Sequence, residues 1–195
     1  MAVVRILSLY KVNMEDKILT IQTDSSIADG DSNTRVAFYT AIGFFVEIAQ
    51  MLEFNLRRLI CYHKSVSEIE EGEITKDRVE SVCSKYDKYY IDTYKAKFTL
   101  GRLTKELRNS SILKSDVFDV FDEINEYRIT VVHKIFQNNI VVDKFREPSF
   151  VKDYISHRLE PMTEKVILMN QLVIKIIGEY QEDLHSYKSS VGISF

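Results

Sequence analysis

Apolar residues recur at intervals of three and four along most of this chain, which is the spacing of one face of an α-helix. Residues 36–63 show it most clearly and predict a long amphipathic helix. Its apolar face consists of Phe38, Ile42, Phe45, Ala49, Leu52, Leu56 and Leu59. The acidic residues 67–73 break the spacing and predict a solvated linker.

Three further stretches, residues 75–96, 99–109 and 116–136, resume the helical spacing. Asp116 is expected to cap the last of them, because an Asp side chain accepts hydrogen bonds from the free N–H groups of a first turn. Pro148 and Pro161 each suit the first turn of a helix. A final stripe is formed by Met162, Val166, Met169, Val173, Ile176, Tyr180 and Leu184. Four or five helices with short connections predict an all-α bundle.

The first part of the chain has a different pattern. Residues 4–23 are expected to form either two short strands around a turn or a helix. Residues 24–33 are polar and rich in turn-forming side chains, which separates this segment from the first long helix. The expected organisation is therefore a small N-terminal appendage, residues 1–33, and a helical domain, residues 34–195.

Composition narrows the class of protein. The chain has 195 residues, 45% of them hydrophobic and 28% charged, as in an ordinary globular protein. Only 6 glycines and 2 prolines are present, which favours few and long helices. Two cysteines give no disulfide framework, and the scattered histidines give no metal-ligand spacing. The interrupted apolar runs predict no membrane span, so we expect a cytoplasmic protein without metal or cofactor.

One charged residue lies on the apolar face of the helix predicted at 116–136. That face consists of Val117, Val120, Phe121, Ile124, Val131 and Ile135. At about 100° per residue, Arg128 falls in the middle of it. A guanidinium among aliphatic side chains costs several kcal/mol unless it has a partner. We therefore expect Arg128 to pair with an acid of another helix, Glu47 or Glu53, to extend to the edge of the bundle, or to bind an anion.

The same helix has a second apolar stripe, which lies about 100° around from the first. It contains Phe118, Ile129, Val132 and Phe136. This stripe needs a second partner, either another helix of the chain or a second copy related by a two-fold axis. His133 lies near its edge. In a regular helix His133 is about 140° from Arg128, so the two side chains would meet within one chain only at a bulge or a frayed end.

Residues 126–133, EYRITVVH, resemble the arginine-to-histidine motif of the HEPN family of helical domains (higher eukaryotes and prokaryotes nucleotide-binding). Residues 99–107 upstream and the opening helix with Glu53 in its body resemble the order of elements in that family. The resemblance implies a bundle that dimerises through the motif helix. In active members it implies a metal-independent endoribonuclease, encountered in toxin–antitoxin and phage-defence systems, whose partners include RNA and antitoxin proteins.

The resemblance assigns roles to two residues. His133 would exchange a proton with the ribose 2′-hydroxyl or the leaving oxygen. Arg128 would stabilise the charge on the scissile phosphate, and the reaction would leave a 2′,3′-cyclic phosphate. Ile129 departs from the polar residue that the family usually has after the arginine. The alternative hypothesis is therefore a catalytically inactive helical dimer that binds a protein partner or a nucleotide.

Two further clusters have a functional and a structural interpretation. Arg102, Lys105 and Arg108 give the segment before the motif helix a positive charge, which either grips RNA phosphates or is a solvated helix face. Tyr86, Tyr90 and Tyr94 are spaced by four, which is typical of a packed stripe, although aromatic residues among lysines also stack on single-stranded RNA.

Overall fold

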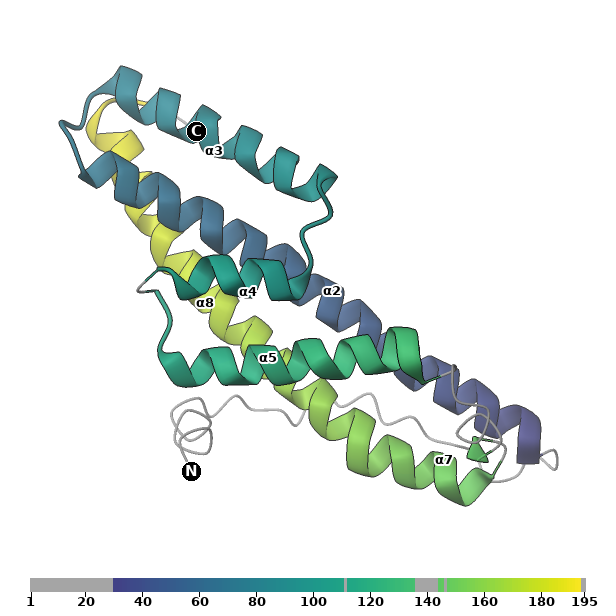
Figure 1. The fold of residues 1–195 in the computed structure, drawn as a ribbon. Helices are drawn as coiled ribbons and strands as arrows, with labels where there is room; N and C mark the ends of the chain where they lie inside the picture. The colour runs from purple at the N-terminus through teal and green to yellow at the C-terminus, as the bar shows by residue number, and fades with distance from the viewer. Residues whose placement is uncertain (1–29, 111, 136–143, 146, 194–195) are drawn as a thin grey trace.

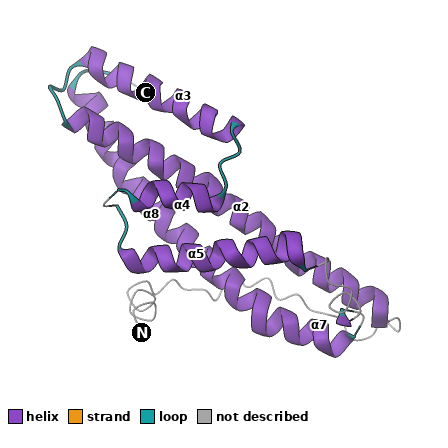
Figure 2. Ribbon diagram, viewed as in Figure 1, coloured by secondary structure: helices purple, strands orange, loops and turns teal. Residues whose placement is uncertain are grey.

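The computed structural model describes residues 30–110, 112–135, 144–145 and 147–193, with side chains described from residue 34 onward. Within these ranges the chain is helical and contains no strand (Figure 2). The predicted all-α class is confirmed for this part of the chain. The strands or helix expected for residues 4–23 lie outside the described residues, whereas the end of the expected appendage is helical from Gly30 onward.

Two long helical segments run side by side in the same direction and form the axis of the molecule (Figure 1). The first is α2, Gly30–Glu70. The second consists of α7, Pro148–Tyr154, the π-helical turn η3, Ile155–Leu159, and α8, Glu160–Ser190. Hydrogen bonds join them at three levels: Asn55 to Asn170 (2.8 Å), His63 to Tyr180 (3.0 Å) and Tyr187 to Glu70 (2.6 Å).

The main core lies on the face of α2 that the apolar spacing predicts. Phe45, Leu52, Leu56 and Leu59 are completely buried there. Each such side chain stabilises the fold by about 1.5–3 kcal/mol relative to an exposed one. The predicted stripe of α8 supplies the opposite side of this core through Met162, Val166, Met169 and Val173.

Three shorter helices cover the two long ones. They are α3, Lys76–Lys95, α4, Leu100–Arg108, and α5, Ser115–Ile129, which continues into the π-helical turn η2, Thr130–Lys134. All six residues of the predicted core face of α5 and η2 are buried. The loop after α3 places Lys97 at φ 51°, and the Phe98 N–H donates to the Thr93 carbonyl (3.2 Å), as in a left-handed helix cap.

Two local predictions are wrong. The expected linker at residues 67–73 is helical as far as Glu70, because Ile69 is fully buried against Val79 and Val82 of α3. Asp116 lies inside the first turn of α5, and Lys114 occupies the N-cap position. A carboxylate in the first turn still interacts favourably with the helix dipole.

Pro161 lies in the first turn of α8, as predicted, yet α8 continues directly from η3. Proline has no N–H, and its ring clashes with the carbonyl four residues earlier in a regular helix. The π-helical turn ends at Leu159, just before Pro161, and this wider turn is a usual way for a helix to accommodate such a residue.

By length and composition alone, Thr34–Glu70 of α2 could cross a membrane, in contrast to the expectation from the interrupted apolar runs. A long core helix passes the same test. In this fold one face of α2 is the largest contributor to the core, while Val36, Tyr39, Phe44, Met51 and Phe54 are exposed on its other faces.

Candidate functional site

Arg128 lies in the last turn of α5 and forms an ion pair with Glu53 of α2. The Arg128 Nη1 and Glu53 Oε1 atoms are 3.2 Å apart, and the two side chains are 20% and 12% exposed. Of the two acids expected as partners, Glu53 is therefore the one in contact, and Glu47 is exposed on α2. This ion pair offsets most of the free-energy cost of placing a cation on an apolar helix face.

Glu53 has a second contact, which the sequence pattern did not reveal. Its Oε1 atom accepts a hydrogen bond from the backbone N–H of Leu100, the first residue of α4 (2.7 Å). Thr99, at the N-cap position, makes no side-chain capping bond, so Glu53 replaces it. A carboxylate at a helix N-terminus is stabilised by the free N–H groups and by the helix dipole. Glu53 therefore links α2, α4 and α5 at one point.

Arg57, one turn after Glu53 on α2, contacts the loop between α3 and α4. Its Nη2 atom donates to the backbone carbonyl of Phe98 (2.9 Å), and its guanidinium lies 5.7 Å from the centroid of the Tyr94 ring. Arg57 is only 6% exposed. The Nε atoms of Arg57 and of Arg128 are both buried without a hydrogen-bond partner within the described part of the chain. The two cations are thus only partly satisfied by the fold.

The helix widens between Arg128 and His133. In η2 the Ile135 N–H donates to the Thr130 carbonyl, five residues back (2.9 Å). A π-helical turn contains more residues than an α-helical turn, so each of its residues advances less than about 100° around the helix axis. The angle between the Arg128 and His133 positions is therefore smaller than the roughly 140° of a regular helix. His133 is exposed, so its imidazole is open to solvent in the single chain.

The predicted interface stripe is only partly available to a partner. Ile129 and Val132 are 37% and 42% exposed beside the π-helical turn. Phe118, in contrast, is 4% exposed and packs in the core against Phe121, with its ring under Arg108. Its assignment to an intermolecular interface is wrong, because the chain buries it internally. Phe136 lies outside the described residues.

The three basic residues expected to contact RNA all lie on α4 and are exposed. Arg108 pairs with Asp122 of α5 (2.6 Å), so its charge is largely offset. Arg102 stacks on the Phe98 ring, 3.4 Å from the centroid. Neither Arg102 nor Lys105 has a carboxylate within ion-pair distance among the residues the structure describes. These two cations lie on α4, whose first residue, Leu100, contacts Glu53.

The tyrosine stripe of α3 is packed at one end only. Tyr86 and Tyr90 are half-buried, and Tyr94 is 64% exposed above Arg57.

No group of three or more His, Cys, Asp or Glu side chains in the described ranges is arranged to hold a metal ion.

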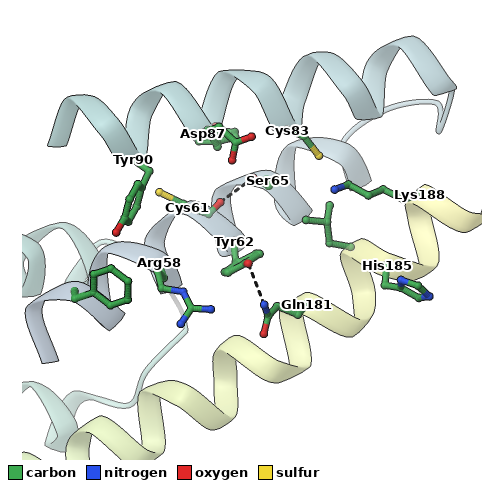
Figure 3. A pocket seen from close by; sticks show the side chains of 13 residues that line it. Arg58, Cys61, Tyr62, Ser65, Cys83, Asp87, Tyr90, Gln181, His185 and Lys188 are labelled. Atoms are coloured by element: carbon green, nitrogen blue, oxygen red, sulfur yellow. Dashed lines mark hydrogen bonds between the residues drawn. The ribbon is translucent and has the colours of Figure 1, made fainter. Parts of the chain in front are cut away.

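A cavity that the sequence pattern did not reveal lies between α2, α3 and α8 (Figure 3). Arg128 is not among its lining residues. The cavity has a volume of about 540 Å³. Its lining comes from three segments far apart in the sequence, and no local pattern signals it. Among the lining side chains are Arg58, Tyr62, Tyr90 and Lys188.

The chain was compared with models of protein families, with curated proteins and with solved structures, and none of the three comparisons finds a match.

Proposed function

We propose that the protein is a HEPN-like homodimer that cleaves RNA without a metal ion, with Arg128 and His133 as the reacting pair. The observation that supports this most is the π-helical turn η2, Thr130–Lys134, which begins two residues after Arg128 and contains His133. Such turns are rare and are frequent at functional sites. The resemblance of residues 126–133 to the arginine-to-histidine motif of that family supplies the chemistry.

In this proposal His133 accepts the proton of a ribose 2′-hydroxyl, and the hydroxyl oxygen attacks the adjacent phosphorus. The bond from phosphorus to the 5′-oxygen breaks, and that oxygen takes up a proton, leaving a 2′,3′-cyclic phosphate. Arg128 stabilises the negative charge that builds on the phosphate oxygens. Glu53 is a positioning residue for Arg128, whose side chain remains 20% exposed. Arg102 and Lys105 lie on the neighbouring helix α4, where they would contact flanking phosphates.

The activity is tested by incubating the purified protein with total RNA in the presence of EDTA. We expect cleavage by the wild-type protein, products ending in a 2′,3′-cyclic phosphate, and a loss of at least about 100-fold in His133→Ala. His157→Ala is the matched control, because His157 is also exposed and also lies on a π-helical turn, η3. Equal cleavage by His133→Ala and the wild type would overturn the assignment.

Dimerisation is tested separately by sedimentation. Ile129→Glu places a charge on the apolar surface beside the π-helical turn and is expected to convert the dimer to a monomer. Ile91→Glu on α3 is the control, since Ile91 is 49% exposed and lies on another helix. An unchanged mass for Ile129→Glu, or a monomeric wild type, would contradict the interface.

A second candidate function is a catalytically inactive helical module that binds a protein or nucleotide. The ion pair between Arg128 and Glu53 favours it, because it gives Arg128 a structural role that needs no substrate. Ile129 also favours this second function, because active members of the HEPN family usually have a polar residue directly after the arginine of the motif. Absence of RNA cleavage by the wild-type dimer would select this function over the nuclease.

A further inference from the structure

The cavity between α2, α3 and α8 shares no residue with the Arg128 region and is lined by a mixture of aromatic and cationic side chains (Figure 3). At one end of the three helices, Ile69, Val79 and Val82 form a small core cluster separate from the main core. The main core lies on another face of α2. Between α2, α3 and α8 lies a pocket of about 540 Å³ that is open to solvent on one side, and this volume is within the range of small-molecule sites.

Arg58 is the first feature that points to a ligand. It is half-buried on α2, and its guanidinium lies 5.8 Å from the Phe54 ring centroid and 6.0 Å from that of Tyr62. Its one hydrogen bond in the described part of the chain, to Asn55 Oδ1, is long at 3.4 Å. No carboxylate of the described residues pairs with it. A guanidinium flanked by aromatic rings and lacking an acid is suited to an anionic ligand.

Lys188 of α8 supplies a second cation, and its ammonium group points into the cavity in Figure 3. Asp87 of α3 is the one acidic side chain in the lining. Two cations and one acid give the lining a net positive charge even when His185 is neutral. The chain as a whole has a net charge of −3, so this positive charge is local to the cavity.

The walls are aromatic and apolar. Tyr86 presents its ring to the cavity, while its hydroxyl donates to Glu68 (2.7 Å) outside it. Tyr90 extends from α3 toward the Arg58 end, with its ring 6.2 Å from that of Phe54. The Tyr62 hydroxyl accepts a hydrogen bond from Gln181 Nε2 (3.0 Å), which leaves its own O–H as a donor. Aromatic faces of this kind bind planar rings.

From this lining we infer that the cavity is a binding site for a small planar aromatic ring that carries an anionic group. The ring lies between the tyrosines of α2 and α3, and the anionic group is held by Arg58 or Lys188. A nucleoside monophosphate and an aromatic carboxylate share this chemistry. The site is independent of the proposed nuclease and is retained if that proposal fails.

The test uses the full-length protein and anilinonaphthalene sulfonate, a fluorescent aromatic anion. We expect saturable binding with one site per chain. Arg58→Gln and Lys188→Met are each expected to weaken binding by about five- to tenfold. Asp87→Asn is expected to strengthen it about two- to fivefold, because it removes the opposing charge. Displacement by adenosine monophosphate assigns a phosphate-bearing ligand, and displacement by naphthoate assigns a carboxylate.

Lys175→Met is the matched control. Lys175 lies on the same helix as Lys188, outside the cavity, and its ammonium is 3.9 Å from Glu179. This variant should bind the probe as the wild type does. Equal affinity in Lys188→Met and Lys175→Met, together with no effect of Asp87→Asn, would overturn the inference. Saturating probe should also slow the alkylation of Cys83, which lines the cavity, and an unchanged rate would place the probe elsewhere. Circular dichroism of each variant checks that it is folded.

Discussion

Removing the Glu53 carboxylate is expected to destabilise the fold more than removing its partner Arg128. Glu53 receives the Leu100 N–H at 2.7 Å and the Arg128 guanidinium at 3.2 Å, and its side chain is 12% exposed. A hydrogen bond to a charged group is worth about 1.5–3 kcal/mol. Leaving a buried cation unpaired costs about 3–5 kcal/mol.

Arg128 is 20% exposed, so water reduces the second cost. We therefore expect Glu53→Ala to lower the free energy of unfolding by about 3 kcal/mol. Glu53→Gln keeps an oxygen for the Leu100 N–H and should cost about 1–2 kcal/mol. Arg128→Met should cost about 1 kcal/mol, because the Glu53 carboxylate then still caps α4.

The measurement is urea unfolding, followed by circular dichroism, of the wild type, Glu53→Ala, Glu53→Gln, Arg128→Met and the Glu53→Gln/Arg128→Met double variant. In the Arg128→Met background, Glu53→Gln should cost less than about 0.5 kcal/mol, which gives a coupling of about 1 kcal/mol. Strictly additive effects, or a loss below about 0.5 kcal/mol for Glu53→Ala, would refute the structural role assigned to this ion pair.

Three further predictions concern stability. Lys97→Gly should raise the free energy of unfolding by about 0.5–1 kcal/mol, because Lys97 has a positive φ of 51° that costs a side chain energy; Lys97→Ala, which has the same φ penalty, should show no such gain. Phe118→Ala should lower the free energy of unfolding of the monomer by about 3–4 kcal/mol, because Phe118 is 4% exposed. A small effect would contradict its burial in the core and favour its assignment to the interface. Burial, and to a lesser degree Lys64, lowers the pKa of His63 below its ordinary value of 6.5, so below that pH the unfolded chain takes up a proton that the folded chain does not. Stability should therefore fall between pH 7 and pH 5 more steeply in the wild type than in His63→Asn, and parallel curves would contradict this.

The helices and the core were predictable from the sequence because both depend on local spacing. Phe45, Leu52, Leu56 and Leu59 recur at three and four, and all are fully buried. The helix bounds at α3 and α4 follow from the same spacing and differ from the prediction by one residue at each end. The spacing also singled out Arg128 as a residue in need of a partner.

The sequence by itself thus determined that the described part of this protein is a helical bundle and which face of each helix is buried, since these depend on side chains a few residues apart. The tertiary structure alone decided that Glu53 rather than Glu47 meets Arg128, that Phe118 is internal, and that Arg58 and Lys188 share a cavity. The first and the last depend on how segments more than 40 residues apart are placed in space, and the burial of Phe118 depends on the packing of α5 into the core. Hydrophobic spacing within one helix fixes which face turns inward, and only the packing of that face against other helices selects the partners it meets.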